Sequence, residues 1–146
     1  RILLSRRKRG TRSLINEREI LTRLRPLGFR RVLLENLSFA DQVKLFYEAE
    51  FVVAPHGAGL TNLVFCQPGA QVLEITTPFR LYGYHCFYEI AHFRQLDYRA
   101  LLGQPVNARE VDPRTGPGDS DIFTPPEQVV DQVHQMLATS RFRQAA

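Results

Sequence analysis

The apolar positions of the chain follow two patterns that alternate along its length. Short runs that are apolar throughout are typical of strands buried on both faces, and they occur at 2–5, 32–34, 51–54, 72–75 and 96–101. Between them, apolar residues recur on one side at helical spacing. This alternation predicts an α/β fold over 1–146: a single three-layer Rossmann-like domain with a mostly parallel sheet and helices on both faces.

Local signals mark where the predicted helices begin and end. Asn16 and Glu19 predict a capping box at the start of the first helix, and Ile15 and Ile20 predict a hydrophobic staple. Gly28 is expected to end this helix, because glycine readily adopts the left-handed conformation found after helices.

The later helices carry similar signals. Ser38 begins the second helix, whose predicted core stripe is Phe39, Val43, Phe46 and Ala49. A short helix ends near residue 66, and another covers about 84–94. Thr124 is expected to cap the last helix, with Pro125 in its first turn and Glu127 completing the box. Pro and Gly accumulate between 103 and 121, which predicts a surface loop.

Composition narrows the class of protein. The chain has 146 residues, 44% hydrophobic and 23% charged, which is the balance of a soluble globular domain. No apolar run approaches the roughly 20 residues that span a bilayer. A net charge of +4, with basic residues crowded into 6–12, favours a phosphorylated or polyanionic partner. Cys66 and Cys86 are isolated and predict a reducing compartment without a disulfide framework.

Polar residues follow two of the predicted strands. Ser5 and Arg6 come after the first strand, and His56 follows the third. His56 opens the segment 56–62, which we call the glycine junction; its glycines let a ligand approach the backbone, and the start of its helix favours an anion. A tight turn that only packs strand against helix is the alternative interpretation. The segment is neither a Walker loop nor the dinucleotide fingerprint.

A set of short motifs in order resembles glycosyltransferase family 61. They are Ser5-Arg6, Arg12, Asn16-Glu17, Leu34-Glu35, Leu37-Ser38-Phe39, Ala54-Pro55 with the glycine junction, Pro68-Gly69 and Val72-Leu73-Glu74. The resemblance implies the two-domain GT-B architecture, of which this chain is the C-terminal, donor-binding half. Because the chain begins at Arg1 within an apolar run, we interpret it as a fragment whose N-terminal acceptor domain is absent.

The resemblance also implies roles for particular residues. Arg6 is expected to reach the diphosphate of a nucleotide sugar, with Arg12 assisting from the next loop. The backbone amides of Gly57, Ala58, Gly59 and Leu60 hold phosphate oxygens. His56 is the catalytic residue that stabilises the departing nucleotide, although a structural histidine is the alternative. Glu74, interpreted as closing the fourth strand, binds the ribose hydroxyls, and Glu35 and Asn36 border the base pocket.

The implied activity is sugar transfer from a UDP-sugar to a glycan acceptor, with inversion and without a metal or other cofactor. Asp119-Ser120-Asp121 has the form of a metal-binding motif but lies in the predicted loop. The implied location is the bacterial cytoplasm, free or at the membrane, or the Golgi or ER lumen in a eukaryote.

Two other functions remain open from the residues alone. One is a nucleotide-binding module without catalysis. The other is a polyanion-binding module that uses the basic segment 6–12. No recognition-helix pattern or aromatic platform accompanies that segment, so nucleic acid is not the expected partner.

Overall fold

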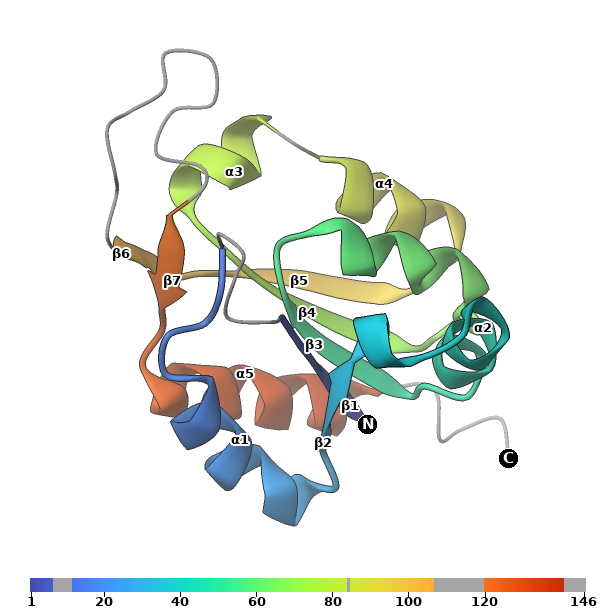
Figure 1. Cartoon of the computed structure of the whole chain (residues 1–146), viewed down its shortest axis with the longest axis horizontal. Helices are drawn as coiled ribbons and strands as arrows, with labels where there is room; N and C mark the ends of the chain where they lie inside the picture. The colour runs from blue at the N-terminus through green and yellow to red at the C-terminus, as the bar shows by residue number, and fades with distance from the viewer. Residues whose placement is uncertain (7–11, 84, 107–119, 141–146) are drawn as a thin grey trace.

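The computed structural model describes residues 1–6, 12–83, 85–106 and 120–140. Within these ranges, a five-stranded parallel sheet has the order β2-β1-β3-β4-β5 (Figure 1). Its strands are β1 (Ile2–Ser5), β2 (Arg30–Leu33), β3 (Phe51–Pro55), β4 (Gln71–Thr76) and β5 (Asp97–Leu102). The predicted parallel sheet is confirmed, and β3 is its central strand.

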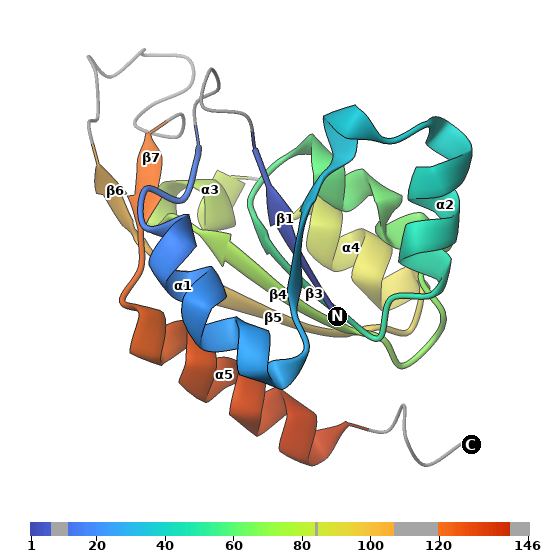
Figure 2. The same cartoon turned by 60° about the horizontal axis from the view of Figure 1, so that its bottom comes forward.

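The strand order determines which face each helix covers. From β1 the chain moves outward to β2, then returns past β1 to β3 and continues to β5. Right-handed crossovers in opposite directions place their helices on opposite faces. One face accordingly carries α1 (Glu17–Leu24), joined by α5 (Pro126–Thr139). The other carries α2 (Phe39–Tyr47), the 3₁₀ helix η3 (Ala58–Phe65) and α4 (Cys86–Phe93), as Figures 1 and 2 show. The three-layer prediction is confirmed.

Each face of the sheet has its own apolar core. On the α1 and α5 side, strand residues such as Leu3, Val53 and Leu73 pack with Ile20, Leu24, Val129 and Met136. On the other side, Leu4, Val52 and Val72 pack with Phe46, Leu60, Leu63 and Phe87. No helix in the described part of the chain is long and apolar enough to cross a membrane.

The helix-end predictions have mixed outcomes. Ser38 caps α2 by accepting a hydrogen bond from the Asp41 amide at 3.1 Å, as predicted. Gly28 has a φ of 84° and follows a short 3₁₀ turn, η1 (Arg25–Leu27), that extends α1. The capping box at Asn16 is wrong, because the Asn16 amide donates instead to the Thr124 carbonyl at 2.8 Å.

A second, antiparallel pair of strands explains the other predictions that were wrong. The described residues contain β6 (Gln104–Val106) paired with β7 (Asp121–Phe123), so the loop predicted over 103–121 is wrong at both ends; 107–119 lie outside the described residues. The Ile15 amide donates to the Ile122 carbonyl, and Ile15 is 51% exposed rather than stapled to the helix. Thr124, predicted as a cap, is fully buried, and α5 begins after Pro125.

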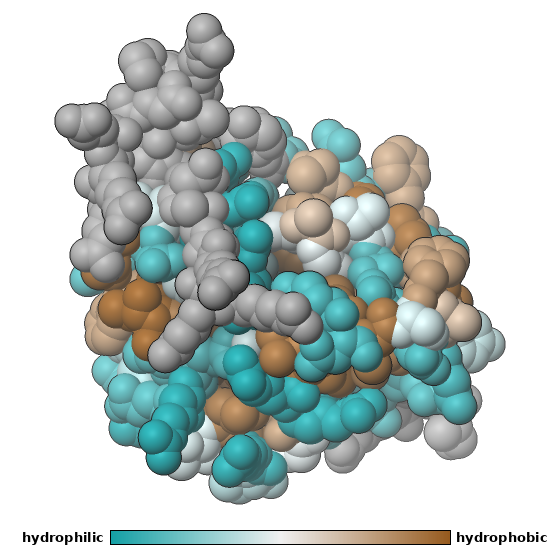
Figure 3. All heavy atoms as spheres, in the orientation of Figure 1, coloured by the Kyte–Doolittle hydropathy of each residue, from teal (hydrophilic) through white to brown (hydrophobic). Residues whose placement is uncertain are grey.

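Two short helical elements of the described residues were not predicted, η2 (Leu34–Asn36) and α3 (Pro78–Gly83). The predicted stripe of α2 is also wrong at Phe39, which is 69% exposed, while Phe46 is buried. Figure 3 shows hydrophobic residues gathered over α2, η3 and α4, and hydrophilic ones over α1 and α5.

The two cores give a direct stability prediction. Phe51 is fully buried and contacts Phe29 edge-to-face at 5.3 Å. We expect Phe51→Ala to lower the free energy of unfolding by about 3–5 kcal/mol, because it leaves a cavity. Phe39→Ala, the matched control at an exposed ring, is expected to cost less than about 1 kcal/mol. Urea unfolding measures both; equal losses would contradict the assignment of Phe51 to the core.

Candidate functional site

An open cavity lies beyond the carboxyl ends of β1 and β3, where the strand order reverses. It has a volume of about 350 Å³, and its lining comes from the ends of β1 and β3, from η2 and α2, and from the glycine junction: Leu4, Ser5, Arg6, Leu34, Glu35, Gln42, Pro55, Gly57, Ala58, Gly59, Leu60 and Asn62. Ligands of open α/β sheets bind at this switch point. The cavity is therefore the candidate functional site.

Arg6 and the glycine junction meet in this cavity. The Arg6 guanidinium donates through Nη1 to the His56 carbonyl at 3.3 Å. A Cβ added to Gly57 would lie 2.5 Å from the same nitrogen. The absence of a side chain at Gly57 thus lets the guanidinium lie against the backbone, and the structure brings these two predicted residues together.

The amides of the glycine junction are only partly available to a ligand. Leu60 donates to the Gly57 carbonyl at 2.9 Å, so the predicted phosphate contact of the Leu60 amide has a competing internal bond. The amides of Gly57, Ala58 and Gly59 lie at the N-cap and in the first turn of η3, and they have no acceptor among the described residues. Such unsatisfied N–H groups attract anions.

The buried side chains of His56 and Glu74 form a polar cluster with the partly buried Tyr98. His56 Nδ1 lies 2.5 Å from Glu74 Oε1, and the Tyr98 hydroxyl donates to Glu74 Oε2 at 2.6 Å. A carboxylate only accepts hydrogen bonds, so Nδ1 carries the proton. Burial, reinforced by the charge of Glu74 and by this hydrogen bond, raises the pKa of Tyr98. The phenol therefore remains a donor at neutral pH.

This geometry corrects the prediction for Glu74. It does not end its strand, because β4 continues to Thr76, and it is only 3% exposed. Both carboxylate oxygens are engaged within the protein. His56 is likewise buried, with its ring against Phe87 at 5.1 Å, and it does not line the cavity. Tyr98 carried no signal in the sequence.

Other predicted site residues lie in different places. Arg12 has a left-handed φ of 70° and does not line the cavity, since the adjacent segment is bonded to β7. Glu35 lines the cavity, but Asn36 does not. The roles proposed for Arg12 and Asn36 stay predictions. Residues 7–9 of the basic segment lie outside the described residues.

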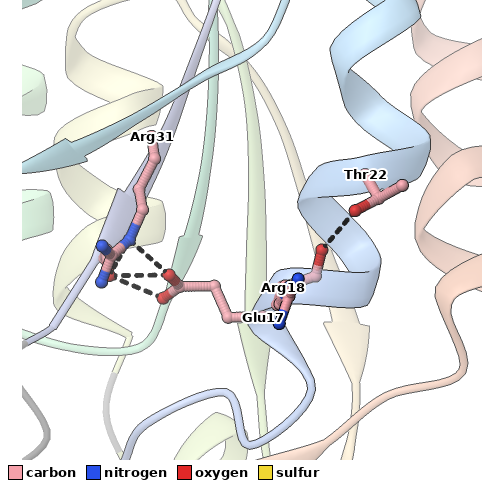
Figure 4. A network of polar contacts seen from close by, with 5 residues as sticks. Glu17, Arg18, Thr22 and Arg31 are labelled. Atoms are coloured by element: carbon pink, nitrogen blue, oxygen red, sulfur yellow. Dashed lines mark hydrogen bonds and ion pairs between the residues drawn. The ribbon is translucent and has the colours of Figure 1, made fainter.

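A second polar cluster holds the end of β1 (Figure 4). The Ser5 hydroxyl donates to Glu17 at 2.7 Å, and Arg31 Nε donates to Glu17 at 2.7 Å and to Ser5 at 3.0 Å. These contacts join β1, β2 and the first turn of α1 directly beside Arg6. Sequence reasoning did not single out Arg31, because an arginine next to an apolar run reads as solvent-exposed.

The described residues contain no group of three or more His, Cys, Asp or Glu side chains that could hold a metal ion. Asp121, from the motif with Asp119, accepts a hydrogen bond from the Ser13 amide at 2.9 Å and lies on β7; Asp119 is outside the described residues.

Fold and cavity place the domain in the Rossmann-like class. Within that class, the chain belongs to the glycosyltransferase 61 family, whose model matches residues 1–73. The matched half includes Arg6, Glu35 and the glycine junction.

Relatives are similar over part of the chain. A beta-1,2-xylosyltransferase RCN11 of Oryza sativa subsp. japonica is 36% identical over 47% of this chain and 13% of its own length. EGF domain-specific O-linked N-acetylglucosamine transferases are 25% identical in Canis lupus familiaris, over 67% of this chain, and 29% identical in Drosophila melanogaster, over 68%. The match spans 19% of each of these transferases.

The partly buried phenol of Tyr98 predicts a pH dependence of stability. The folded state holds this proton more tightly than the unfolded chain, where the pKa of tyrosine is about 10. Its contribution is therefore complete below about pH 10 and is lost as the pH rises further. Above that pH we expect wild type to lose up to about 1.4 kcal/mol more per pH unit than Tyr98→Phe.

Urea unfolding of both proteins at a series of pH values measures this difference. Below about pH 9 their stabilities should differ by a constant amount. Parallel losses above pH 10 would show that the phenol ionises freely in the folded protein.

Proposed function

We propose that this chain is the donor-binding domain of a glycosyltransferase and that its cavity holds a nucleoside diphosphate sugar, with a UDP-sugar as the expected donor. The observation that carries the proposal is the convergence of Arg6 and the amides of Gly57, Ala58 and Gly59 on one switch-point cavity. Membership of the glycosyltransferase 61 family and relatives named as sugar transferases support it.

Catalysis on this proposal is electrostatic. The bond between the anomeric carbon and the diphosphate oxygen breaks, and the diphosphate leaves with the electron pair while the acceptor oxygen bonds to that carbon from the opposite side. The Arg6 guanidinium and the N–H groups at the start of η3 stabilise the negative charge of the leaving diphosphate. This positive field takes the place of a divalent metal.

The remaining parts of the reaction lie outside this cavity. We expect a glycan hydroxyl as acceptor and a base for its proton, both provided by the N-terminal domain. His56 supports Arg6 through its backbone carbonyl, while its imidazole is anchored to Glu74. On this proposal His56 is a positioning residue, and direct action of its imidazole on the diphosphate stays a prediction.

Removing Arg6 tests the proposed phosphate contact. Arg6→Ala should weaken UDP binding by about 10- to 150-fold, because a hydrogen bond to a charged group contributes about 1.5–3 kcal/mol. Arg23→Ala removes the same charge from an exposed position on α1 and should change affinity little. Calorimetry with a chelator present throughout measures both.

Equal small effects of the two variants would remove Arg6 from the site, and binding that requires added Mg²⁺ or Mn²⁺ would contradict the metal-independent mechanism. Repeating the titration with duplex DNA over a range of salt concentrations separates the polyanion-binding alternative, which predicts DNA binding with a steep salt dependence.

The two glycines of the junction should respond differently to an added methyl group. In Gly57→Ala the methyl collides with the Arg6 guanidinium, so we expect UDP affinity to fall about tenfold or more while the domain stays folded. In Gly59→Ala it meets only the end of the Leu34 side chain, at 3.0 Å, and a small effect is expected. Melting curves and UDP titrations of both variants check this; wild-type affinity in a folded Gly57→Ala protein would contradict the site.

A further inference from the structure

Two glutamates near the cavity differ in what surrounds them. Glu74 is buried and gives both oxygens to His56 and Tyr98. Glu35, in η2 directly after β2, is exposed and lines the cavity. Its carboxylate has no hydrogen bond or ion pair with any residue of the described ranges. Of the two, Glu35 is the carboxylate that a bound molecule can reach.

A chain of amide hydrogen bonds connects the Glu35 segment to the glycine junction. Gln42 Nε2 donates to the carbonyls of Leu34 at 3.1 Å and Leu37 at 3.4 Å. Carbonyls only accept, so the nitrogen of Gln42 must face them, and its oxygen accepts from Asn62 Nδ2 at 3.1 Å. Asn62 Nδ2 also donates to the Gly59 carbonyl at 3.3 Å.

This network fixes the orientation of the Asn62 amide. Its nitrogen is committed to Gln42 and Gly59, which leaves Asn62 Oδ1 as an acceptor on the cavity wall that also carries Glu35. That wall accepts hydrogen bonds, whereas Arg6 and the Gly57 amide, which belong to the same cavity lining, donate them. A diphosphate would be repelled by Glu35, so the acceptor wall suits a part of the ligand with hydroxyl donors.

We propose that Glu35, together with Asn62 Oδ1, binds the ribose hydroxyls of the nucleotide, the role that the sequence had suggested for Glu74. The proposal rests on the proposed nucleotide-sugar site and assigns its nucleoside end. A ribose diol offers two O–H donors, which match a carboxylate and an amide oxygen. The diphosphate then extends from this wall to Arg6 and the glycine junction.

The test compares UDP with 2′-deoxy-UDP, which differ by one hydroxyl, on matched variants of the chain. Wild type should prefer UDP by about tenfold, the usual contribution of a hydrogen bond to a charged acceptor. In Glu35→Ala the preference should fall close to one, and in Glu35→Gln, which keeps one acceptor, it should be intermediate. Glu48→Ala removes an exposed carboxylate at the end of α2 and should leave the preference unchanged.

The ratio of the two affinities is informative because a general loss of structure lowers both together. A wild-type ratio near one overturns the ribose assignment, and so does a ratio that survives in Glu35→Ala. Loss of the preference in Glu74→Gln but not in Glu35→Ala would return the ribose contact to Glu74. If wild type binds neither nucleotide, nor any other nucleoside diphosphate, the proposed function itself fails together with this assignment.

Discussion

The reversal of the chain's direction across the sheet is the constraint on which the other features depend. β1 lies between β2 and β3, so the crossovers that leave β1 and β2 run in opposite directions and their helices must lie on opposite faces. Because α1 turns to one face and α2 to the other, the carboxyl ends of β1 and β3 open into a cavity. Arg6 and Gly57, 51 positions apart by their numbers, become neighbours only through this reversal.

Two polar clusters, one on each face of the sheet, hold the two strand ends that border the cavity. On the α1 face, Glu17 and Arg31 fix Ser5, the residue before Arg6. On the α4 face, Glu74 and Tyr98 fix His56, the residue before Gly57. Hydrogen-bonded networks are rigid, and in the second cluster the buried His56 and Glu74 would be costly without their partners. The clusters therefore restrict the approach of Arg6 to the glycine junction, and of their members only Ser5 lines the cavity.

The sequence was sufficient for features that depend on local patterns. Apolar runs located all five parallel strands, and Ser38 marked a helix start, because its partner is three residues away. Asn16 and Thr124 carried equally good local signals, but the Asn16 side chain donates to the distant Thr124 carbonyl instead of capping α1, and the Thr124 side chain is buried without capping α5. Glu74 was misread because one acidic residue within an apolar run gives no sign of whether the strand ends there. Tyr98, Arg31 and Gln42 had no signal, since each completes a cluster with partners from other elements. The assignment of the glycine junction to ligand binding rested on the family resemblance.

The distribution of charge also differs from one part of the cavity lining to another. Three glutamates lie in or near the cavity, and two have partners within the protein: Glu17 forms an ion pair with Arg31, and Glu74 accepts hydrogen bonds from His56 Nδ1 and the Tyr98 hydroxyl. Glu35, after β2, has no such partner among the described residues, while Arg6, after β1, and the start of η3, after β3, provide positive potential. An anionic ligand with a neutral, hydroxyl-bearing portion has lower energy in one orientation than in the reverse. On the proposed function, the nucleoside therefore lies toward β2 and the diphosphate against the glycine junction.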